Sequence, residues 1–163
     1  AIILLIGLII ACLMPNLLFY NPNESYASAY GKADAGFTTI VLTTPDEYKQ
    51  LKDLTAVTMK DFNFIDSNFI PLNDGHYLVN FSSSVEASTN GEIGAKLYIN
   101  GREINYCYAH RDFTVGKTGS GGFNCIIDLN AGDIVNVWFD DHANPTATLT
   151  FQSANLSIVR VGD

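Results

Sequence analysis

The sequence predicts an all-β fold, an antiparallel sandwich or barrel of about ten strands that follows a separate apolar segment. Beyond residue 35, short runs of β-branched and aromatic residues recur about every 8–12 residues, with Gly, Pro, Asn and Asp between them. None of these runs has the apolar spacing of an amphipathic helix. Repeated short strands separated by turn residues are typical of an antiparallel sandwich or barrel.

The composition fits one folded domain. The chain has 163 residues, of which 47% are hydrophobic and 16% are charged, and about 135 residues follow the apolar start, enough for a single core. Nine Lys and Arg face seventeen Asp and Glu, for a net charge of −8. Because phosphate binding needs a basic footprint, nucleic acid is excluded as a partner. The acidity predicts a solvated surface, with cation binding as the alternative.

The first twenty residues, AIILLIGLIIACLMPNLLFY, carry no charge. As a helix they would span about 30 Å, the thickness of a bilayer core, but Pro15 would end that helix near Met14. Four interpretations are open: a secretory signal with a cleavage pattern at Ala27-Ser28-Ala29, a membrane anchor, a pilin-like packing segment inside a filament, and a lipoprotein leader ending at Cys12. The Ile-rich run also suits an extended donor strand.

All four interpretations export the protein, so we expect it outside the cell or on the cell surface, with membrane contact through this segment. The sequence then divides into the apolar segment 1–20, a linker at 21–29 and a β domain at 30–163. If the segment packs between subunits, the residues expected to make that contact are Ile2, Ile3, Leu5, Ile6, Ile9 and Ile10.

Ten strands are expected, each an apolar or alternating run that ends at turn residues. Asn100-Gly101 predicts a tight hairpin between two of them. Residues 45–51 are expected to form a loop or one helical turn, and Gly116–Gly122 a flexible turn. The expected strands are 37–42, 56–59, 62–65, 77–85, 95–99, 102–113, 123–129, 134–139, 146–151 and 156–161.

The stretch FIPLNDGHYLVNF, residues 69–81, shows this logic most clearly. Asn73-Asp74-Gly75 predicts a turn, because Gly adopts backbone conformations that strain bulkier residues. The side chains of Tyr77, Val79 and Phe81 then lie on one face of a strand, since strand side chains alternate. Phe69, before the turn, is placed to pack across it.

The order Phe62, Phe69, Gly75, Tyr77, Phe81 resembles the latter half of the signature of the complement-one-q globular domain and its tumour necrosis factor-like relatives. Val57 and Val79 depart from that signature, which prefers Asn or Asp at the first position and an aromatic residue at the second. Three further segments resemble the same family and extend the match over residues 30–163; they are 97–101, 129–135 and 156–161.

The resemblance implies a jelly roll that usually assembles as a trimer around apolar and aromatic strand faces. Tyr77, Phe81 and Trp138 are the aromatic candidates for assembly contacts, although each is more often a core residue, because a two-layer sandwich needs such side chains. The wider set of aromatic candidates for the trimer axis is Tyr77, Phe81, Tyr98, Trp138, Phe139 and Phe151.

No catalytic motif is evident. The sequence has no Gly-x-Ser-x-Gly elbow, phosphate loop or His-Glu-x-x-His motif. His76, His110 and His142 are widely spaced and are expected at the surface. We therefore predict that the protein is not an enzyme and needs no cofactor.

One cluster of oxygen donors suggests a metal. The stretch Asp140-Asp141-His142-Ala143-Asn144 would form an apical loop, and calcium prefers oxygen ligands. Asp140, Asp141 and Asn144 are the candidate calcium ligands, and a solvated turn is the alternative.

Two cysteines are placed to pair. Cys107 and Cys125 each lie about nine residues from Gly116, so a hairpin would set them opposite one another, where an exported protein would form a disulfide. The alternative is two small buried side chains. No Cys-x-x-Cys pair is present, so a zinc site is not expected.

Three functions are compared. The first is an exported structural or adhesive subunit that self-assembles as a trimer or pilus-like filament. The second is a secreted or phage-fibre trimer whose apical loops bind a glycan or protein receptor. The third, a glycosidase or cupin-like metal enzyme, lacks a histidine cluster or a carboxylate pair. Retention of residues 1–20 between subunits would favour the first function, and their cleavage the second.

Overall fold

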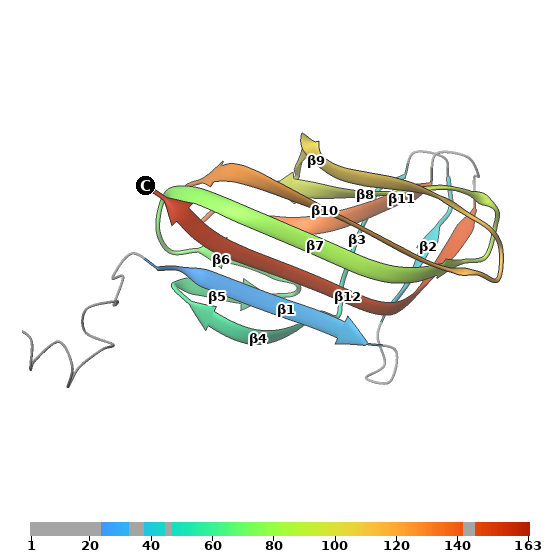
Figure 1. Ribbon diagram of the computed structural model, residues 1–163, viewed down its shortest axis with the longest axis horizontal. Helices are drawn as coiled ribbons and strands as arrows, with labels where there is room; N and C mark the ends of the chain where they lie inside the picture. The colour runs from blue at the N-terminus through green and yellow to red at the C-terminus, as the bar shows by residue number, and fades with distance from the viewer. Residues whose placement is uncertain (1–23, 33–37, 45–46, 142–145) are drawn as a thin grey trace, which may run out of the picture.

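The computed structural model describes residues 24–32, 38–44, 47–141 and 146–163. These residues form twelve strands in two antiparallel sheets and include no helix (Figure 1). The described part of the chain therefore has no helix of the length and hydropathy that a membrane span requires. The expectations for residues 1–20 fall outside the described residues; they concern Ile2, Ile3, Leu5, Ile6, Ile9 and Ile10.

The first sheet, sheet A, has six strands. Figure 1 looks onto it, with β7 and β12 side by side across its centre. The strand β2 pairs with the start of β12, beside the main path. In order across the sheet, the strands are β10 (Thr118–Leu129), β7 (Gly75–Ala87), β12 (Ala147–Gly162), β1 (Tyr26–Lys32) and β4 (Thr55–Lys60), with β2 at Thr39–Leu42.

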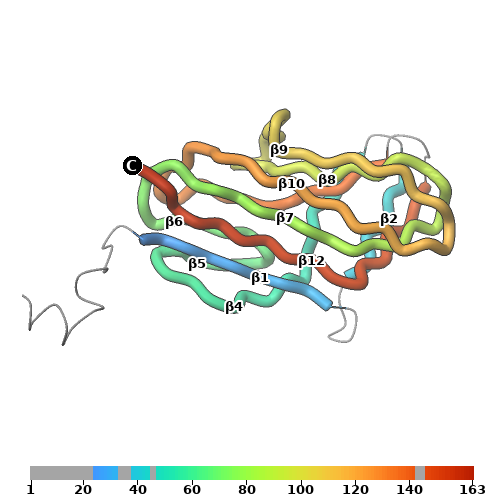
Figure 2. The backbone as a smooth tube through the Cα atoms, in the orientation of Figure 1, coloured from blue at the N-terminus to red at the C-terminus, as the bar shows by residue number. Residues whose placement is uncertain are grey.

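The second sheet, sheet B, also has six strands and lies behind sheet A in the view of Figure 2. The strand β3 pairs with β11, beside the main path. In order across the sheet, the strands are β5 (Phe62–Ile65), β6 (Asn68–Pro71), β11 (Val135–Asp141), β8 (Gly91–Ile99) and β9 (Arg102–Phe113), with β3 at Lys49–Gln50.

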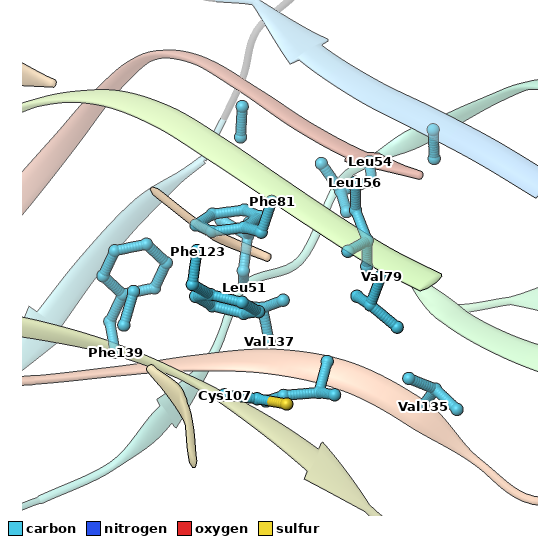
Figure 3. Packing of buried hydrophobic residues seen from close by; sticks show 14 of the residues in the cluster. Leu51, Leu54, Val79, Phe81, Cys107, Phe123, Val135, Val137, Phe139 and Leu156 are labelled. Carbon is cyan, nitrogen blue, oxygen red and sulfur yellow. The ribbon is translucent and has the colours of Figure 1, made fainter. Parts of the chain in front are cut away.

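The core fills the space between the sheets, where alternate side chains from both meet. Tyr77, Val79 and Phe81 share one buried face of β7, with exposed fractions of 0%, 0% and 4%. This confirms the face predicted from the sequence. Figure 3 shows Phe81 beside Phe123 and Phe139, and the ring centroids lie 5.4 and 5.9 Å from that of Phe81.

Tyr77, on the buried face of β7, also fixes the turn that precedes this strand. The Tyr77 hydroxyl donates to the carbonyl of Asn73 at 2.8 Å, so the buried ring keeps its polar end satisfied. Phe62 packs edge-on against both Tyr77 and Phe69, with ring centroids 5.6 and 6.5 Å apart respectively. Phe69, the turn at Gly75 and the alternating residues Tyr77, Val79 and Phe81 thus form one corner of the core.

The number of strands differs from the prediction. Nine of the twelve strands contain expected runs, because β12 joins the two runs at 146–151 and 156–161 through a bulge at Gln152. Three strands were not expected. They are β1, which begins in the predicted linker and continues to Lys32, β3 in the predicted loop, and β6, which contains Phe69.

The glycine-rich stretch was also predicted differently. The turn is confined to Thr114–Lys117, closed by a hydrogen bond from the Lys117 amide to the Thr114 carbonyl. Gly116 adopts a φ of 70° in that turn, which Gly tolerates. Gly119, Gly121 and Gly122 instead belong to β10 and pair with β7.

A disulfide joins the two sheets. Cys107 on β9 is bonded to Cys125 on β10, with Cα atoms 5.6 Å apart. Because β9 edges sheet B and β10 edges sheet A, the bond closes one side of the sandwich. The sequence separation is 18, and a loop of this size is expected to add about 3 kcal/mol of stability through the unfolded chain. Figure 3 shows Cys107 at the margin of the core.

Candidate assembly face and aromatic groove

The outer face of sheet A carries rows of small, uncharged polar side chains. In each row, residues paired across β10, β7, β12 and β1 point away from the core. One row runs Asn124, Asn80, Ser157 and Ser28. We call the surface that these rows form the neutral face; it consists of Ser28, Tyr30, Asn80, Ser82, Ser84, Ser120, Asn124, Ser153, Asn155 and Ser157.

An apolar row adjoins the neutral face. Ile126, Leu78, Val159 and Tyr26 are aligned across the same four strands and point outward. Ile126 is 59% exposed and Val159 is 36% exposed. This row therefore presents branched apolar side chains to solvent in a single line.

Charged side chains stay at the margins of this surface. Lys32 ends β1, and Glu86 and Asp128 lie near opposite ends of β7 and β10. Between them the small side chains leave a shallow hollow next to the Tyr30 ring, lined by Tyr30, Lys32, Ser84, Ser120, Ser153 and Asn155. Depletion of charge at the centre of a patch is a feature of protein interfaces.

The outer face of sheet B is different, because three aromatic side chains stack on it. Tyr98 lies between Tyr48 and Trp138, with ring centroids 5.8 and 5.0 Å away. The Lys96 ammonium donates to the Tyr48 hydroxyl at 3.1 Å and pairs with Glu103 at 2.6 Å. It also lies 5.0 Å from the Tyr48 ring centroid, within cation–π range.

The pKa values in this cluster follow from burial and charge. Burial, reinforced by the Glu103 carboxylate, raises the pKa of Tyr98 to about 12. Burial also raises the pKa of Tyr48. For Lys96, burial opposes the charged form, but hydrogen bonds to Glu103 and Tyr48 outweigh it and the pKa is raised. The cluster is thus held by a protonated lysine and neutral tyrosines.

A chain of amides fixes the Trp138 indole. Its Nε1–H donates to the Asn136 side-chain carbonyl at 2.7 Å, and the Asn136 amide donates to Asn68 at 2.6 Å. Gln50 donates to the same Asn68 oxygen at 3.0 Å. Trp138 and Gln50 are register partners on β11 and β3, so the ring is held from both strands.

A groove opens beside this indole, where β2 of sheet A approaches β3 of sheet B. The Lys49 ammonium donates to the Val41 carbonyl at 2.5 Å and pairs with Glu47 at 3.2 Å, which ties the two strands together. We call it the Trp138 groove; its lining residues are Thr38, Thr39, Ile40, Val41, Lys49, Gln50, Lys52, Asp53 and Trp138.

The loop next to the groove is held by Glu47. Its carboxylate accepts hydrogen bonds of 2.8 Å from both the backbone amide and the hydroxyl of Thr43. These two bonds, with a smaller contribution from Lys49, lower the pKa of Glu47 to about 2. The carboxylate therefore stays charged through the neutral range and keeps the Lys49 ammonium engaged.

Four of the aromatic residues expected at a trimer axis are core residues. Tyr77, Phe81, Phe139 and Phe151 have exposed fractions between 0% and 4%. Their side chains face the opposite sheet, as the core alternative predicts, so Tyr77 and Phe81 are not placed to contact another subunit.

Trp138 and Tyr98 are partly exposed, but they lie on sheet B, away from the neutral face. The six aromatic candidates therefore do not form one surface.

The acidic pair does not converge. Asp140 and Asp141 are consecutive at the end of β11, so their side chains point to opposite faces of sheet B. Asp140 is buried against Gly94 of β8. Asn144 lies outside the described residues, and those described hold no group of three His, Cys, Asp or Glu that could bind a metal. A calcium site here stays a prediction.

His76 and His110 are exposed, as predicted, and each faces an acid on the neighbouring strand. His76 pairs with Asp128, and His110 pairs with Glu92 at 3.0 Å. His142 lies outside the described residues.

The neutral face and the groove were not predicted from the sequence. The signal for the neutral face lies in the polar half of the alternation in β7, where Asn80, Ser82 and Ser84 separate the buried residues. The groove gave no comparable signal, because Gln50 and Lys52 belong to a segment without alternation and meet Trp138 only through the fold.

No family model and no curated protein matches the sequence. Solved structures do match. Eiger TNF from S. frugiperda aligns with a TM-score of 0.63 and 13% identity, over 86% of this chain and 94% of that one. Murine APRIL aligns with a TM-score of 0.63 and 15% identity, over 85% of this chain and all of that one.

A viral protein matches as well. The vertex protein P5 of PRD1 aligns with a TM-score of 0.58 and 11% identity, over 85% of this chain and 73% of that one. At such low identities the likeness is one of fold. The chain therefore has the jelly-roll fold of the tumour necrosis factor-like and complement-one-q-like proteins.

Proposed function

We propose that this protein is an exported structural or adhesive subunit that self-associates, as a homotrimer, through the neutral face and its apolar row. The observation that carries the proposal is the absence of charge across the middle of that face. The protein has a net charge of −8, yet the charged residues nearest this surface, Lys32, Glu86 and Asp128, stand at its rim.

The chemistry of the face suits contact between identical copies. Ser and Asn side chains both donate and accept hydrogen bonds, so a surface rich in them can pair with a different part of the same surface on the next copy, as a three-fold ring requires. Small side chains let two backbones approach closely, and the Tyr30 ring stands beside a hollow that a partner side chain could fill. The exposed Ile126 and Val159 side chains gain free energy when water is removed from them.

The structural neighbours support an assembly module without specifying it. One is named as a vertex protein, one as Eiger TNF and one as APRIL. The disulfide between Cys107 and Cys125 supports export, since such bonds persist in oxidising compartments. Residues 1–20 would then anchor the assembled subunits or pack between them. The proposal includes no enzymatic activity and no cofactor.

Sedimentation of the full chain tests the proposal. We expect a trimer at micromolar concentration. Asn155→Arg puts a like charge from each copy into the centre of the face, and we expect its dissociation constant to rise by about 100-fold or more. Asn63→Arg, on an exposed position of β5 in sheet B, is the matched control and should remain trimeric.

Two results would count against the proposal. One is a wild-type protein that stays monomeric at tens of micromolar, and the other is equal association of the two arginine variants. Electron microscopy of the native material then distinguishes discrete trimers from filaments.

A further inference from the structure

We propose that the Trp138 groove binds a neutral sugar unit of a surface glycan. This goes beyond self-association, because the groove lies at the edge where β2 of sheet A meets β3 of sheet B and includes none of the residues of the neutral face. It also places ligand recognition on the sheet edge rather than on the apical loops that the sequence favoured.

The indole supplies the first requirement, a fixed aromatic surface. Trp138 packs against Tyr98 at 5.0 Å and donates its only N–H to Asn136 at 2.7 Å. The indole is therefore held before any ligand arrives, and its ring offers an apolar contact without an unsatisfied donor. The face of an aromatic ring is electronegative and attracts the weakly positive C–H groups on the face of a pyranose ring.

The polar lining supplies the second requirement, hydrogen bonds of both kinds. Gln50 uses its amide N–H groups on Asn68 and on the carbonyl of Asp66, so its carbonyl oxygen is available only to accept. Asp53 brings a carboxylate, and the Thr39 hydroxyl can donate or accept. Vicinal sugar hydroxyls need such a mixture, because each is both donor and acceptor.

The balance of charge selects a neutral ligand. The Lys49 ammonium is engaged by Glu47 and by the Val41 carbonyl. Lys52 and Asp53 are adjacent and of opposite sign, and both line the groove. No excess of positive charge is left for a phosphate, sulfate or sialic acid group.

The chain offers a direct probe, because Trp138 is its only tryptophan. We would titrate the full-length protein with glucose, galactose, mannose, N-acetylglucosamine and short oligomers of each, and record intrinsic fluorescence. We expect a saturable change with at least one of these neutral sugars. Calorimetry with that sugar then measures the variants, including those that lack the indole.

Trp138→Ala and Gln50→Ala should each weaken binding at least tenfold, equivalent to about 1.4 kcal/mol. Tyr106→Ala is the matched control, because Tyr106 is a 67% exposed aromatic residue on the same sheet outside the groove. It should bind as the wild type does. Gln50→Ala keeps the test valid if the loss of the indole unfolds the chain, which circular dichroism would show.

Three outcomes would overturn the proposal: no neutral sugar alters the fluorescence, binding survives Gln50→Ala unchanged, or only acidic sugars or peptides bind. The assembly proposal is separable from this one. The Asn155→Arg variant should bind the same monosaccharide with unchanged affinity, whether or not the wild type is a trimer. A trimer adds avidity toward a multivalent glycan but no new contact.

Discussion

At the scale of single residues, Tyr98 connects the stability of sheet B to pH. Its hydroxyl is held neutral because burial and the Glu103 carboxylate both oppose ionisation, which raises its pKa to about 12. A group whose folded pKa is raised stabilises the fold fully below its unfolded pKa and loses that contribution as pH rises through the folded value. The raised pKa of Lys96 acts in the same direction.

We therefore expect the free energy of unfolding to fall between about pH 10, the ordinary pKa of tyrosine, and pH 12. Tyr98→Phe removes one of the groups responsible, so its stability should fall less steeply over that range. Urea midpoints of both proteins from pH 8 to 11.5, with tyrosinate absorbance followed in parallel, measure this. Parallel curves for the two proteins would mean that Tyr98 ionises as freely in the fold as in the unfolded chain.

At the scale of elements, the glycines of β10 show why a glycine-rich stretch need not be a turn. Gly119 faces the Phe113 ring, and Gly122 lies against the Phe81 carbonyl and the Ser82 Cα of β7. A side chain at either position would collide with its neighbour, so these glycines allow close approach between strands. At Gly121 an added Cβ would meet no atom within 4 Å.

This difference between adjacent residues gives a controlled test. Gly122→Ala should destabilise the protein by about 1–3 kcal/mol, because the new methyl group overlaps backbone that cannot move independently. Gly121→Ala should be neutral or stabilising by up to about 1 kcal/mol, because it restricts the unfolded chain without a clash. Thermal unfolding of the two variants decides the matter, and an equal loss in both would contradict the close packing of β10 on β7.

How far the sequence predicts these elements depends on their own pattern. The strand around Tyr77, Val79 and Phe81 alternates, and its buried face was predicted from the sequence. β3 is two residues long and exists because Gln50 and Lys49 pair with Trp138 and Phe139. Such pairing depends on residues far away in the chain, so no local rule predicts it. The Trp138 groove was missed for the same reason.

The bulge in β12 was missed for a different reason. Residues 146–151 and 156–161 were expected to form two separate strands, but a bulge at Gln152 absorbs one extra residue and the ladder with β7 continues. The neutral face depends on that continuity, since Ser153 and Asn155 follow the bulge and still point outward beside Ser84 and Ser82.

At the scale of the whole molecule, the two sheets divide the proposed roles. The outer face of sheet A offers an uncharged surface to copies of itself, and the groove between β2 of sheet A and β3 of sheet B offers Trp138 of sheet B to a ligand. A homotrimer that buried the neutral face, which shares no residue with the groove, would carry three grooves. The disulfide between Cys107 and Cys125 and the shared core hold the two sheets in a fixed relation, so assembly would also fix the orientation of the three grooves.

The position of β1 limits where the chain can be processed. β1 lies between β12 and β4. Ala27 and Ala29 are buried, with exposed fractions of 2% and 0%. The Ser25 carbonyl also accepts a hydrogen bond from the Arg160 amide at 2.8 Å. Cleavage after the Ala27-Ser28-Ala29 pattern would remove most of a central strand, and β4 would lose the partner that attaches it to sheet A.

We therefore expect a chain that begins at Glu24 to unfold cooperatively, with the same melting temperature as the β domain in the full chain. A chain that begins at Tyr30 should lose cooperative unfolding, because β12 and β4 would each present an unpaired edge where β1 had been. Circular dichroism melts and limited proteolysis of the two chains test this. Equal melting temperatures would show that β1 is dispensable and would restore Ala27-Ser28-Ala29 as a cleavage site. If only the chain that begins at Tyr30 loses cooperative unfolding, a cleavage that leaves the domain folded must lie before β1. Tyr26 and Tyr30 then stay in place on the outer face of sheet A.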